Sequence, residues 1–301
     1  METEKLLWHV YLRLFQSAAQ WHNRRFPPSF EARIGESQVD FACRDWHMSC
    51  RRAESLQDRF RGGCHILLSG PSVRKIANPG LLKNAFLIGV NGSPQMLDEF
   101  GIGMDLYVVD DLHFVRNRTE DYLRFAGRAD MTLVNYGIAA ELRQRGLTIP
   151  NGVIVETINT PFRRARPSVA DTIVFSRRFA DGLKPYGTVA YVALQAAYCL
   201  GFRQVSLFGL DLNSATRYYP EGRPEPSNLL REYEDLILRP FATIGAMVRA
   251  GEWSVVNASP ESRLPSTVLP KADPNDILES RRSADLAPAT ELAPQVAVSA
   301  A

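Results

Sequence analysis

Histidine and cysteine are scarce in this sequence, and charge of neither sign dominates it. The chain of 301 residues has five histidines, four cysteines and a net charge of only +2. Because the cysteines form no Cys-x-x-Cys pair, no zinc site is indicated, and we expect Cys43, Cys50, Cys64 and Cys199 to be reduced thiols. A protein that binds nucleic acid concentrates basic residues on one face. We therefore expect neither a metal site nor a nucleic-acid partner.

Long apolar runs are also missing. No stretch reaches the eighteen or more apolar residues of a membrane span, and Glu2 and Glu4 stand where a secretory signal would be basic. The sequence thus predicts a cytoplasmic protein. Residues 5–20 nevertheless have apolar residues at helical spacing, which predicts an N-terminal amphipathic helix. This helix could pack on the domain, join a second subunit in a homo-oligomer, or contact the inner face of the cytoplasmic membrane.

From Cys64 onward, short apolar runs rich in branched residues alternate with helical stretches. Such alternation predicts an α/β fold, a Rossmann-like and mainly parallel sheet with helices on both faces. The expected strands are 64–69, 85–91, 105–111, 131–135, 153–158, 204–211 and 253–257, and the expected helices are 94–100, 119–127, 138–145, 188–200 and 228–250.

The pattern divides the chain into three parts. We expect an N-terminal helical extension at residues 1–62, a Rossmann-like domain at 63–265 and a disordered tail at 266–301 that is rich in Ala, Pro and Ser. Two irregular, basic segments at 160–187 and 213–227 interrupt the alternation. Long loops in compact domains are often functional, so we interpret both as lids, the second at about residues 213–230.

Polar residues follow four of the expected strands. The carboxyl ends of parallel strands meet at one edge of a sheet, so these residues predict a binding site there. They are Gly70, Pro71 and Ser72 after the first strand, Asn91 and Gly92 after the second, Asp110, Asp111 and His113 after the third, and Asp211 after the sixth. The Gly-Pro-Ser turn suits an anion, but it is neither a Walker P-loop nor a GxGxxG fingerprint.

Several of these residues have two interpretations. Asn91 fits a hydrogen bond to a base or ribose, or a turn in left-handed geometry. Asp110, Asp111 and His113 together could supply a general base, whereas Asp111 also suits a helix cap.

Two further groups suit an anionic ligand. Thr188 opens an apolar helix whose N-terminus suits a phosphate or carboxylate. Arg217, Tyr218 and Tyr219 suit a phosphate leaving group, or they belong to a solvated basic loop.

Five segments carry a family resemblance. HILLSGPSV, FLIGVNGSP, DLYVVDD and TVAYVALQAAYCLGFRQVSLFGLDLN, followed by RYYPEG, resemble the bacterial sialyltransferase-like glycosyltransferases over about residues 64 to 260. That group includes CMP-sialic acid transferases and the Kdo transferases of the lipopolysaccharide core. The resemblance implies a nucleotide-sugar-binding catalytic domain, a CMP-sugar co-substrate, inverting transfer, no cofactor or required metal, and residence at the inner face of the cytoplasmic membrane.

The resemblance also implies roles by position. Gly70, Pro71 and Ser72 would lie against the CMP, and Asn91 with Gly92 would contact the nucleotide or donor sugar. The donor site would further include Asp110, Thr188 and Asp211, with Arg217 and Tyr218 or Tyr219 at the phosphate leaving group.

The general base is where this sequence departs from the sialyltransferases. They place a histidine base in the lid, whereas no histidine follows His113 here. This difference favours the Kdo-transferase side of the group, with Glu232, Glu234, Asp111 or His113 as the base. The expected function is transfer of Kdo or a similar keto-sugar acid from a CMP donor to a lipopolysaccharide or other glycan acceptor, within lipopolysaccharide biosynthesis.

Two alternatives stay open. The helix and strand at 188–213 also resemble pterin pyrophosphokinase-like enzymes, which transfer diphosphate from ATP with magnesium, and Asp110 with Asp111 could then bind the metal. The other alternative is a catalytically inactive nucleotide-binding protein.

Overall fold

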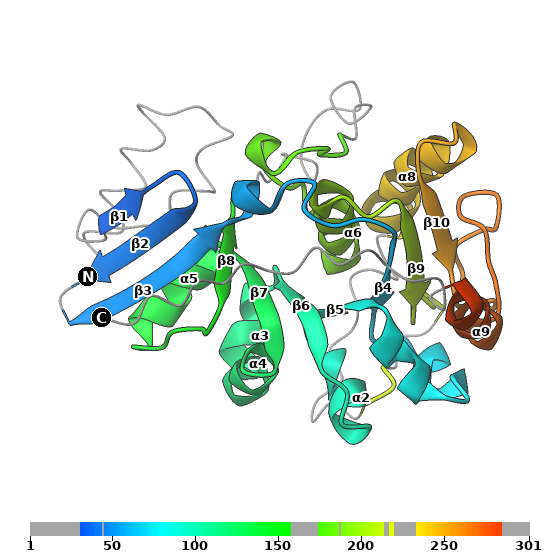
Figure 1. Ribbon diagram of the computed structural model, residues 1–301, viewed down its shortest axis with the longest axis horizontal. Helices are drawn as coiled ribbons and strands as arrows, with labels where there is room; N and C mark the ends of the chain where they lie inside the picture. Colours follow the sequence, from blue (N-terminus) through cyan, green and yellow to red (C-terminus); the bar gives the residue numbers. More distant parts are fainter. Residues whose placement is uncertain are drawn as a thin grey trace.

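A ten-stranded, mainly parallel sheet runs through the molecule (Figure 1). The structure is a computed structural model that describes residues 31–43, 45–157, 174–186, 188–213, 217–219 and 233–284. The strand order is β1-β2-β3-β8-β7-β6-β5-β4-β9-β10, antiparallel from β1 to β3 and parallel from β3 onward. The predicted α/β class and mainly parallel sheet are confirmed.

The strands and helices predicted between residues 64 and 257 are present in the described residues, and the structure adds strands and helices that the sequence did not predict. The strands are β1 (Glu31–Ile34), β2 (Gln38–Cys43), β3 (Trp46–Arg52), β4 (Gly63–Leu67), β5 (Phe86–Val90), β6 (Met104–Val109), β7 (Ala129–Asn135), β8 (Gly152–Val155), β9 (Gln204–Phe208) and β10 (Ser254–Asn257). The helices are α2 (Pro94–Glu99), α3 (Leu112–Asn117), α4 (Thr119–Ala126), α5 (Tyr136–Gln144), α6 (Val189–Leu200), α8 (Arg239–Arg249) and α9 (Pro274–Ala284). A π-helical turn, Glu234–Leu238, leads directly into α8.

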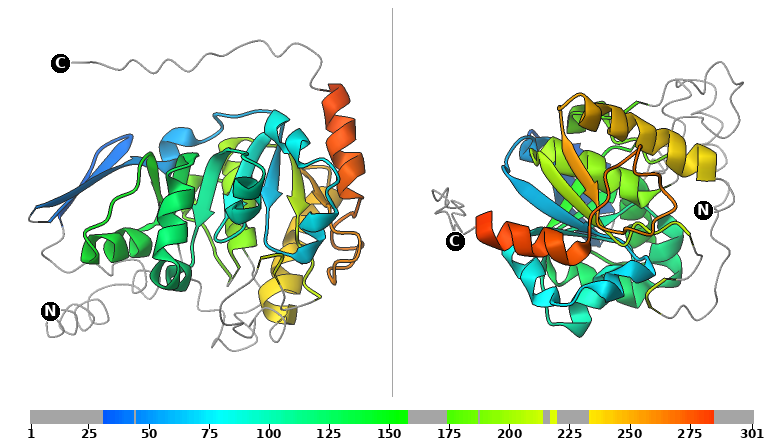
Figure 2. Two further views of the ribbon diagram at one scale, coloured as in Figure 1. Left: turned by 90° about the horizontal axis from the view of Figure 1, so that it is seen from below. Right: turned by 90° about the vertical axis from the view of Figure 1, so that its right-hand side faces the viewer.

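Helices cover both faces of the parallel strands (Figures 1 and 2). Successive strand residues point to opposite faces, so Ile66 packs in a core with α6 and α8 while the adjacent Leu67 packs in a second core with α2 to α5. Cys64 and Cys199 lie in the first core and Cys50 in the second, and all three thiols are buried. The continuous apolar runs of the sequence are therefore buried on both sides.

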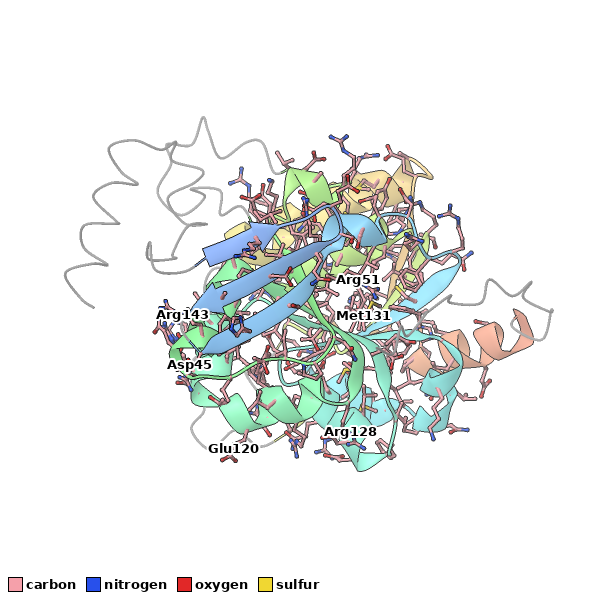
Figure 3. The ribbon with its side chains drawn as sticks, turned by 60° about the vertical axis from the view of Figure 1, so that its left-hand side comes forward. Asp45, Arg51, Glu120, Arg128, Met131 and Arg143 are labelled. Atoms are coloured by element: carbon pink, nitrogen blue, oxygen red, sulfur yellow. The ribbon has the colours of Figure 1, made fainter. Side chains whose placement is uncertain are left out.

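The expectation of a helical extension at residues 1–62 is wrong for residues 31–52. These form β1, β2 and β3, an antiparallel extension of the sheet that projects from one end of the molecule (Figure 2) and lies at the front of Figure 3, where Arg51 of β3 is labelled. In β2, Val39 and Phe41 are buried while Gln38 and Asp40 are exposed. This period of two is that of an antiparallel sheet covered on one face.

The expectation of a disordered tail at residues 266–301 is also wrong in its described part. Helix α9 packs against the body, with Ile277 and Leu278 buried in the core that also contains α2 to α5. The Asn275 side chain accepts a hydrogen bond from the Ala77 amide at 2.8 Å and donates one to the Lys75 carbonyl at 3.2 Å. Two adjacent apolar residues and the hydrogen bonds of Asn275 therefore hold this helix against the body.

Several predicted features lie outside the described residues. These are the amphipathic helix at 5–20, residues 285–301 of the tail, and the lid segments at 158–173, 214–216 and 220–232. The described half of the first predicted lid, residues 174–186, buries Phe179 and Leu183 in the core beside α6. Within the described part of the chain, no helix is both long enough and apolar enough to cross a membrane.

Candidate functional site

The strand order reverses at β4. Strands β5 to β8 follow one another on one side of β4, whereas β9 and β10 lie on its other side. In open α/β sheets, ligands bind at such a reversal, outside the carboxyl ends of the strands. The turn after β4 and the residues after β9 therefore form the centre of the candidate site.

Asp211, after β9, holds the turn after β4. The Ser72 amide donates a hydrogen bond to Asp211 Oδ2 at 2.7 Å, and the Ser72 hydroxyl donates to Oδ1. The same hydroxyl lies 2.8 Å from Ser259 Oγ, after β10. Because Asp211 is buried, these bonds to a charged acceptor hold the turn firmly in place. The structure thus brings Ser72 and Asp211 together, with Asp211 bonded to the protein itself.

The segment after β9 packs against Gly70 and leaves no room for a side chain there. Its amide donates to the Gly209 carbonyl at 3.0 Å. A Cβ on Gly70 would lie 2.5 Å from that carbonyl oxygen and 2.6 Å from Asp211 Oδ2. Pro71 then opens a 3-10 turn, Pro71–Lys75. The close approach of the segment after β9 thus explains the glycine of the Gly-Pro-Ser turn.

Asn91, directly after β5, carries a buried acceptor that has no hydrogen-bond partner among the described residues, its side-chain Oδ1. Its backbone is left-handed, with φ at 44°, and its carbonyl accepts a hydrogen bond from the Tyr107 hydroxyl at 2.7 Å. A buried acceptor without a donor costs about 1–3 kcal/mol. Both interpretations of Asn91 therefore fit the structure, since it is a turn residue and also offers an acceptor to a ligand.

Gly92 adjoins a cluster of Tyr219 and two arginines. The Tyr219 hydroxyl fills the space in which a Cβ of Gly92 would lie. Arg217 Nη1 donates to this hydroxyl at 3.1 Å, and the Arg118 guanidinium lies over the Tyr219 ring at 4.9 Å. Arg118 is held by Asp121, at 2.6 Å. Two guanidinium groups therefore flank one tyrosine at the end of β5, which suits an anionic ligand.

Tyr218 has a different position from Tyr219. Its hydroxyl donates to the Ser93 carbonyl at 2.8 Å and accepts from the Met96 amide at the start of α2. Its own carbonyl accepts from Arg74 Nε at 3.0 Å, and its amide donates to the Ser69 carbonyl at 3.0 Å. Tyr218 thus anchors residues 217–219 to the protein.

Asp110 and Asp111 have separate partners. Asp110, after β6, accepts a hydrogen bond from Asn135 Nδ2 at 2.7 Å, and burial raises the pKa of Asp110 to about 7. Asp111 caps α3, its Oδ1 accepting from the His113 amide at 2.8 Å, and the His113 side chain is exposed. The helix-cap interpretation of Asp111 is therefore confirmed.

The candidate base Glu234 lies apart from Asp111. Glu232 lies outside the described residues, and Glu234 is exposed at the start of the π-helical turn. Next to it, the Tyr233 hydroxyl donates to the carbonyl of Arg263, whose amide donates to the Asp211 carbonyl. Glu234 is thus on the β9 side of the site, whereas Asp111 follows β6, three strand spacings or about 14 Å away.

Thr188 caps α6, its hydroxyl accepting from the Ala190 amide at 3.3 Å. The helix behind it is buried almost all round, as its apolar sequence predicts. Since α6 precedes β9 in a parallel crossover, its N-terminus lies at the same edge of the sheet as the other predicted site residues.

Sequence reasoning missed three residues of this region. Asn135 follows an apolar strand in the same way as Asn91, and this signal could have identified it. Arg118 and Ser259 stand in no comparable pattern. Within the described ranges, no three His, Cys, Asp or Glu side chains are grouped to hold a metal ion.

Comparison with known proteins shows a consistent relationship. Residues 49–147 match the model of the family described as 3-deoxy-D-manno-octulosonic acid transferase WaaZ. A probable 3-deoxy-manno-octulosonic acid transferase of Salmonella typhimurium (strain LT2) is 26% identical over 233 residues, which cover 69% of this chain and 85% of that protein. A protein of the same description from Escherichia coli (strain K12) is 27% identical over 196 residues, covering 56% of this chain and 68% of that protein.

One solved structure is also similar, that of the sialyltransferase CST-II in complex with a trisaccharide acceptor and CMP. Its TM-score is 0.41 at 12% identity, covering 73% of this chain and 98% of that chain. The predicted resemblance to Kdo transferases is confirmed by the family model and the two relatives, to which this chain is similar.

Proposed function

We propose that this protein is a glycosyltransferase that moves Kdo or a similar keto-sugar acid from a CMP-activated donor to a lipopolysaccharide or other glycan acceptor, with inversion and without a metal ion. One observation carries the proposal. The segment that matches the Kdo transferase family, residues 49–147, contains the carboxyl ends of β4 to β7. The similarity therefore falls on the strand ends that carry Ser72, Asn91 and Asp110.

The donor would lie across the reversal at β4. The turn of Gly70, Pro71 and Ser72 would face the CMP, and Asn91 Oδ1 would accept a hydrogen bond from a base or ribose group, which supplies the partner this buried atom lacks among the described residues. Thr188, at the start of α6, would face the same ligand.

The leaving group would lie near Tyr219. Arg217 and Arg118 flank this tyrosine, and charge-assisted hydrogen bonds strengthen as negative charge develops on the departing phosphate. Tyr218 would hold the segment in place, since its hydroxyl is already bonded at α2. A donor that carries a carboxylate suits the same positive charge.

The reaction would be a single displacement. An acceptor hydroxyl loses its proton to a base and attacks the anomeric carbon of the donor sugar from the face opposite to CMP, so the configuration inverts. The bond from that carbon to the phosphate oxygen breaks, and CMP leaves with the electron pair. Holding both substrates in line supplies much of the rate.

Ligand-induced thermal stabilisation tests the proposal. A ligand at 100 times its Kd stabilises the protein by about 2.7 kcal/mol. We expect a shift with CMP that does not depend on magnesium and that UMP, GDP, ATP and NAD do not produce, followed by turnover of CMP-Kdo with truncated lipopolysaccharide. A shift with ATP and magnesium alone would contradict the proposal and support the pyrophosphokinase alternative.

The proposal includes contact with the inner face of the cytoplasmic membrane through residues 5–20, which would bring the enzyme to a lipid-linked acceptor. Apolar residues at helical spacing with Arg13, Arg24 and Arg25 nearby support it. Sedimentation with anionic liposomes compares the full chain with a chain that lacks residues 1–25. Equal pelleting of the two would contradict membrane contact through this segment.

A further inference from the structure

Asp110 and Asn135 form a pair at the ends of two neighbouring strands. Val109 of β6 pairs with Val134 of β7, so the next residues of the two strands lie side by side. Asn135 Nδ2 donates to Asp110 Oδ1 at 2.7 Å. The pair lies next to the Asn91-Gly92 turn that follows β5, and so within the carboxyl edge that would hold the donor.

The orientation of the Asn135 amide is determined by a second contact. Asn135 is the N-cap of α5, and its Oδ1 accepts from the Ile138 amide at 2.9 Å. A backbone amide can bond only to the oxygen of that side chain, so its nitrogen must face Asp110. Asn135 therefore holds one carboxylate oxygen of Asp110, while the other oxygen accepts no hydrogen bond from the described residues.

The charges around Asp110 are unusual for a structural carboxylate. No Lys or Arg of the described residues forms an ion pair with it, and its charged neighbour is Asp111. Burial and, to a lesser degree, Asp111 raise the pKa of Asp110, while the bond from Asn135 lowers it, with a result of about 7. Tyr136, the titratable residue after Asn135, has its pKa raised to about 12 by burial and stays neutral.

Asp111 and His113, which lie near Asp110 in the sequence, are less suitable as a general base. Asp111 is bonded to the α3 backbone and His113 is exposed. Asp110 alone among these three combines partial burial, a fixed orientation and a strand-end position. Carboxylates with these properties serve as general bases near neutral pH.

We infer that Asp110 is the general base of the transfer and that Asn135 is its positioning residue; this rests on the proposed function. The ionised carboxylate takes the proton of the acceptor hydroxyl while the acceptor oxygen bonds to the anomeric carbon. The bond between that carbon and the phosphate oxygen breaks, and its electron pair departs with CMP. The proton remains on Asp110 until it is released to water, so the enzyme returns to its initial state.

The test measures transfer by four variants of the full chain, with CMP-Kdo as donor and a truncated lipopolysaccharide as acceptor. Asp110→Asn should lower kcat by about 100-fold to 10,000-fold and keep the thermal shift with CMP, which verifies that it is folded. Asn135→Ser keeps an N-cap acceptor but removes the amide donor. Asp130→Asn, on exposed Asp130 of β7 at the opposite edge of the sheet, is the matched control and should leave kcat unchanged.

The pH profile distinguishes positioning from a structural role. For the wild type, kcat/KM should rise through about pH 7, the pKa of Asp110. In Asn135→Ser the lost hydrogen bond should move this limb to higher pH, because that bond favours the ionised form. An unmoved limb would overturn the role of Asn135. A loss of less than about tenfold in Asp110→Asn, or a large loss in Asp111→Asn instead, would overturn Asp110 as the base.

Failure of the proposed function can be distinguished from failure of the inference about Asp110 by measurements on the wild type. The wild-type protein would then give no thermal shift with CMP and no transfer from CMP-Kdo, and both proposals would fall. A wild type that binds CMP and transfers Kdo, together with a fully active Asp110→Asn, would overturn only the inference about Asp110.

Discussion

Tyr219 packs directly against Gly92, and its hydroxyl occupies the position that the Cβ of any larger residue at position 92 would take. Gly92→Ala should displace Tyr219 from Arg217 and Arg118 and lower stability by about 1–3 kcal/mol, the usual effect of overpacking. The thermal shift with CMP should be reduced in the same variant. Denaturant unfolding and the CMP shift measure the two effects.

The control for this change is Gly103→Ala, since nothing lies within 4 Å of a Cβ at Gly103. It should unfold and bind CMP as the wild type does. If the thermal shift with CMP in Gly92→Ala equals that of the wild type, the position of Tyr219 does not affect ligand binding.

The bond between Ser72 and Asp211 should contribute to stability as well as to the site. Asp211→Ala removes both acceptors of Ser72 and should lower the free energy of unfolding by about 1.5–3 kcal/mol, as for hydrogen bonds to a charged group. Ser72→Ala loses the hydroxyl bonds but keeps the amide bond, so its effect should be smaller.

A double-mutant cycle in urea tests whether these two residues act as a pair. The loss in the double variant should be less than the sum of the two single losses. Glu120→Gln, an exposed change on α4 (Figure 3), should change stability by no more than about 0.5 kcal/mol. Additive losses would mean that the two residues stabilise the protein independently.

Asp110 should make stability depend on pH. Its carboxyl keeps a proton up to about pH 7 in the folded protein but only up to about pH 4 when unfolded. The folded state therefore binds more protons between these values, and stability attributable to this group falls as pH rises through the window. Asp110→Asn removes the titration and should be more stable than the wild type at pH 8, with the difference vanishing towards pH 4.

Urea unfolding at about pH 4.5, 6 and 8 measures the difference in the free energy of unfolding between Asp110→Asn and the wild type. These pH values begin near the unfolded pKa of aspartate, about 4. A difference between Asp110→Asn and wild type that stays constant across the three pH values would contradict the raised pKa.

Helix α9 should be part of the folded unit. Leu278 is 3% exposed, and Leu278→Ala should lower the free energy of unfolding by about 2–4 kcal/mol through the lost apolar contact and the cavity. Ser280→Ala, on the exposed side of the same helix, should stay within about 0.5 kcal/mol of the wild type. A single unfolding transition in both variants is expected, and equal stability of the two would contradict docking of the helix.

The fold was largely predictable where apolar runs were continuous. Runs such as CHILLS and TVAYVALQAAYCL are apolar on almost every side. They are removed from water only as a strand or helix that is buried all round, so their place in the core could be predicted. The antiparallel strands β2 and β3 were missed although their apolar residues alternate with polar ones, because each run is short and β3 includes Met48 and Cys50, which carry a weak strand signal.

The site was predictable in part, for a related reason. Asn91 and Asp110 follow local strand patterns, so their place at the carboxyl edge could be inferred. The partner of Asp211 could not be inferred from the sequence. Ser72 lies 139 residues away, and local patterns do not determine which strand lies beside β4. The same applies to Gly92 with Tyr219, whose contact depends on how the segment after β9 crosses to the end of β5.

The place of β4 between β5 and β9 also sets when the site can form during synthesis. Ser72 leaves the ribosome 139 residues before Asp211 and 187 residues before Ser259. Until β9 arrives, a nascent chain has β4 as an open sheet edge, which is the part of a growing sheet most prone to pair with another chain. The arrival of β9 covers that edge and brings Asp211 to Ser72 in one event, before Ser259 has been synthesised and joins them.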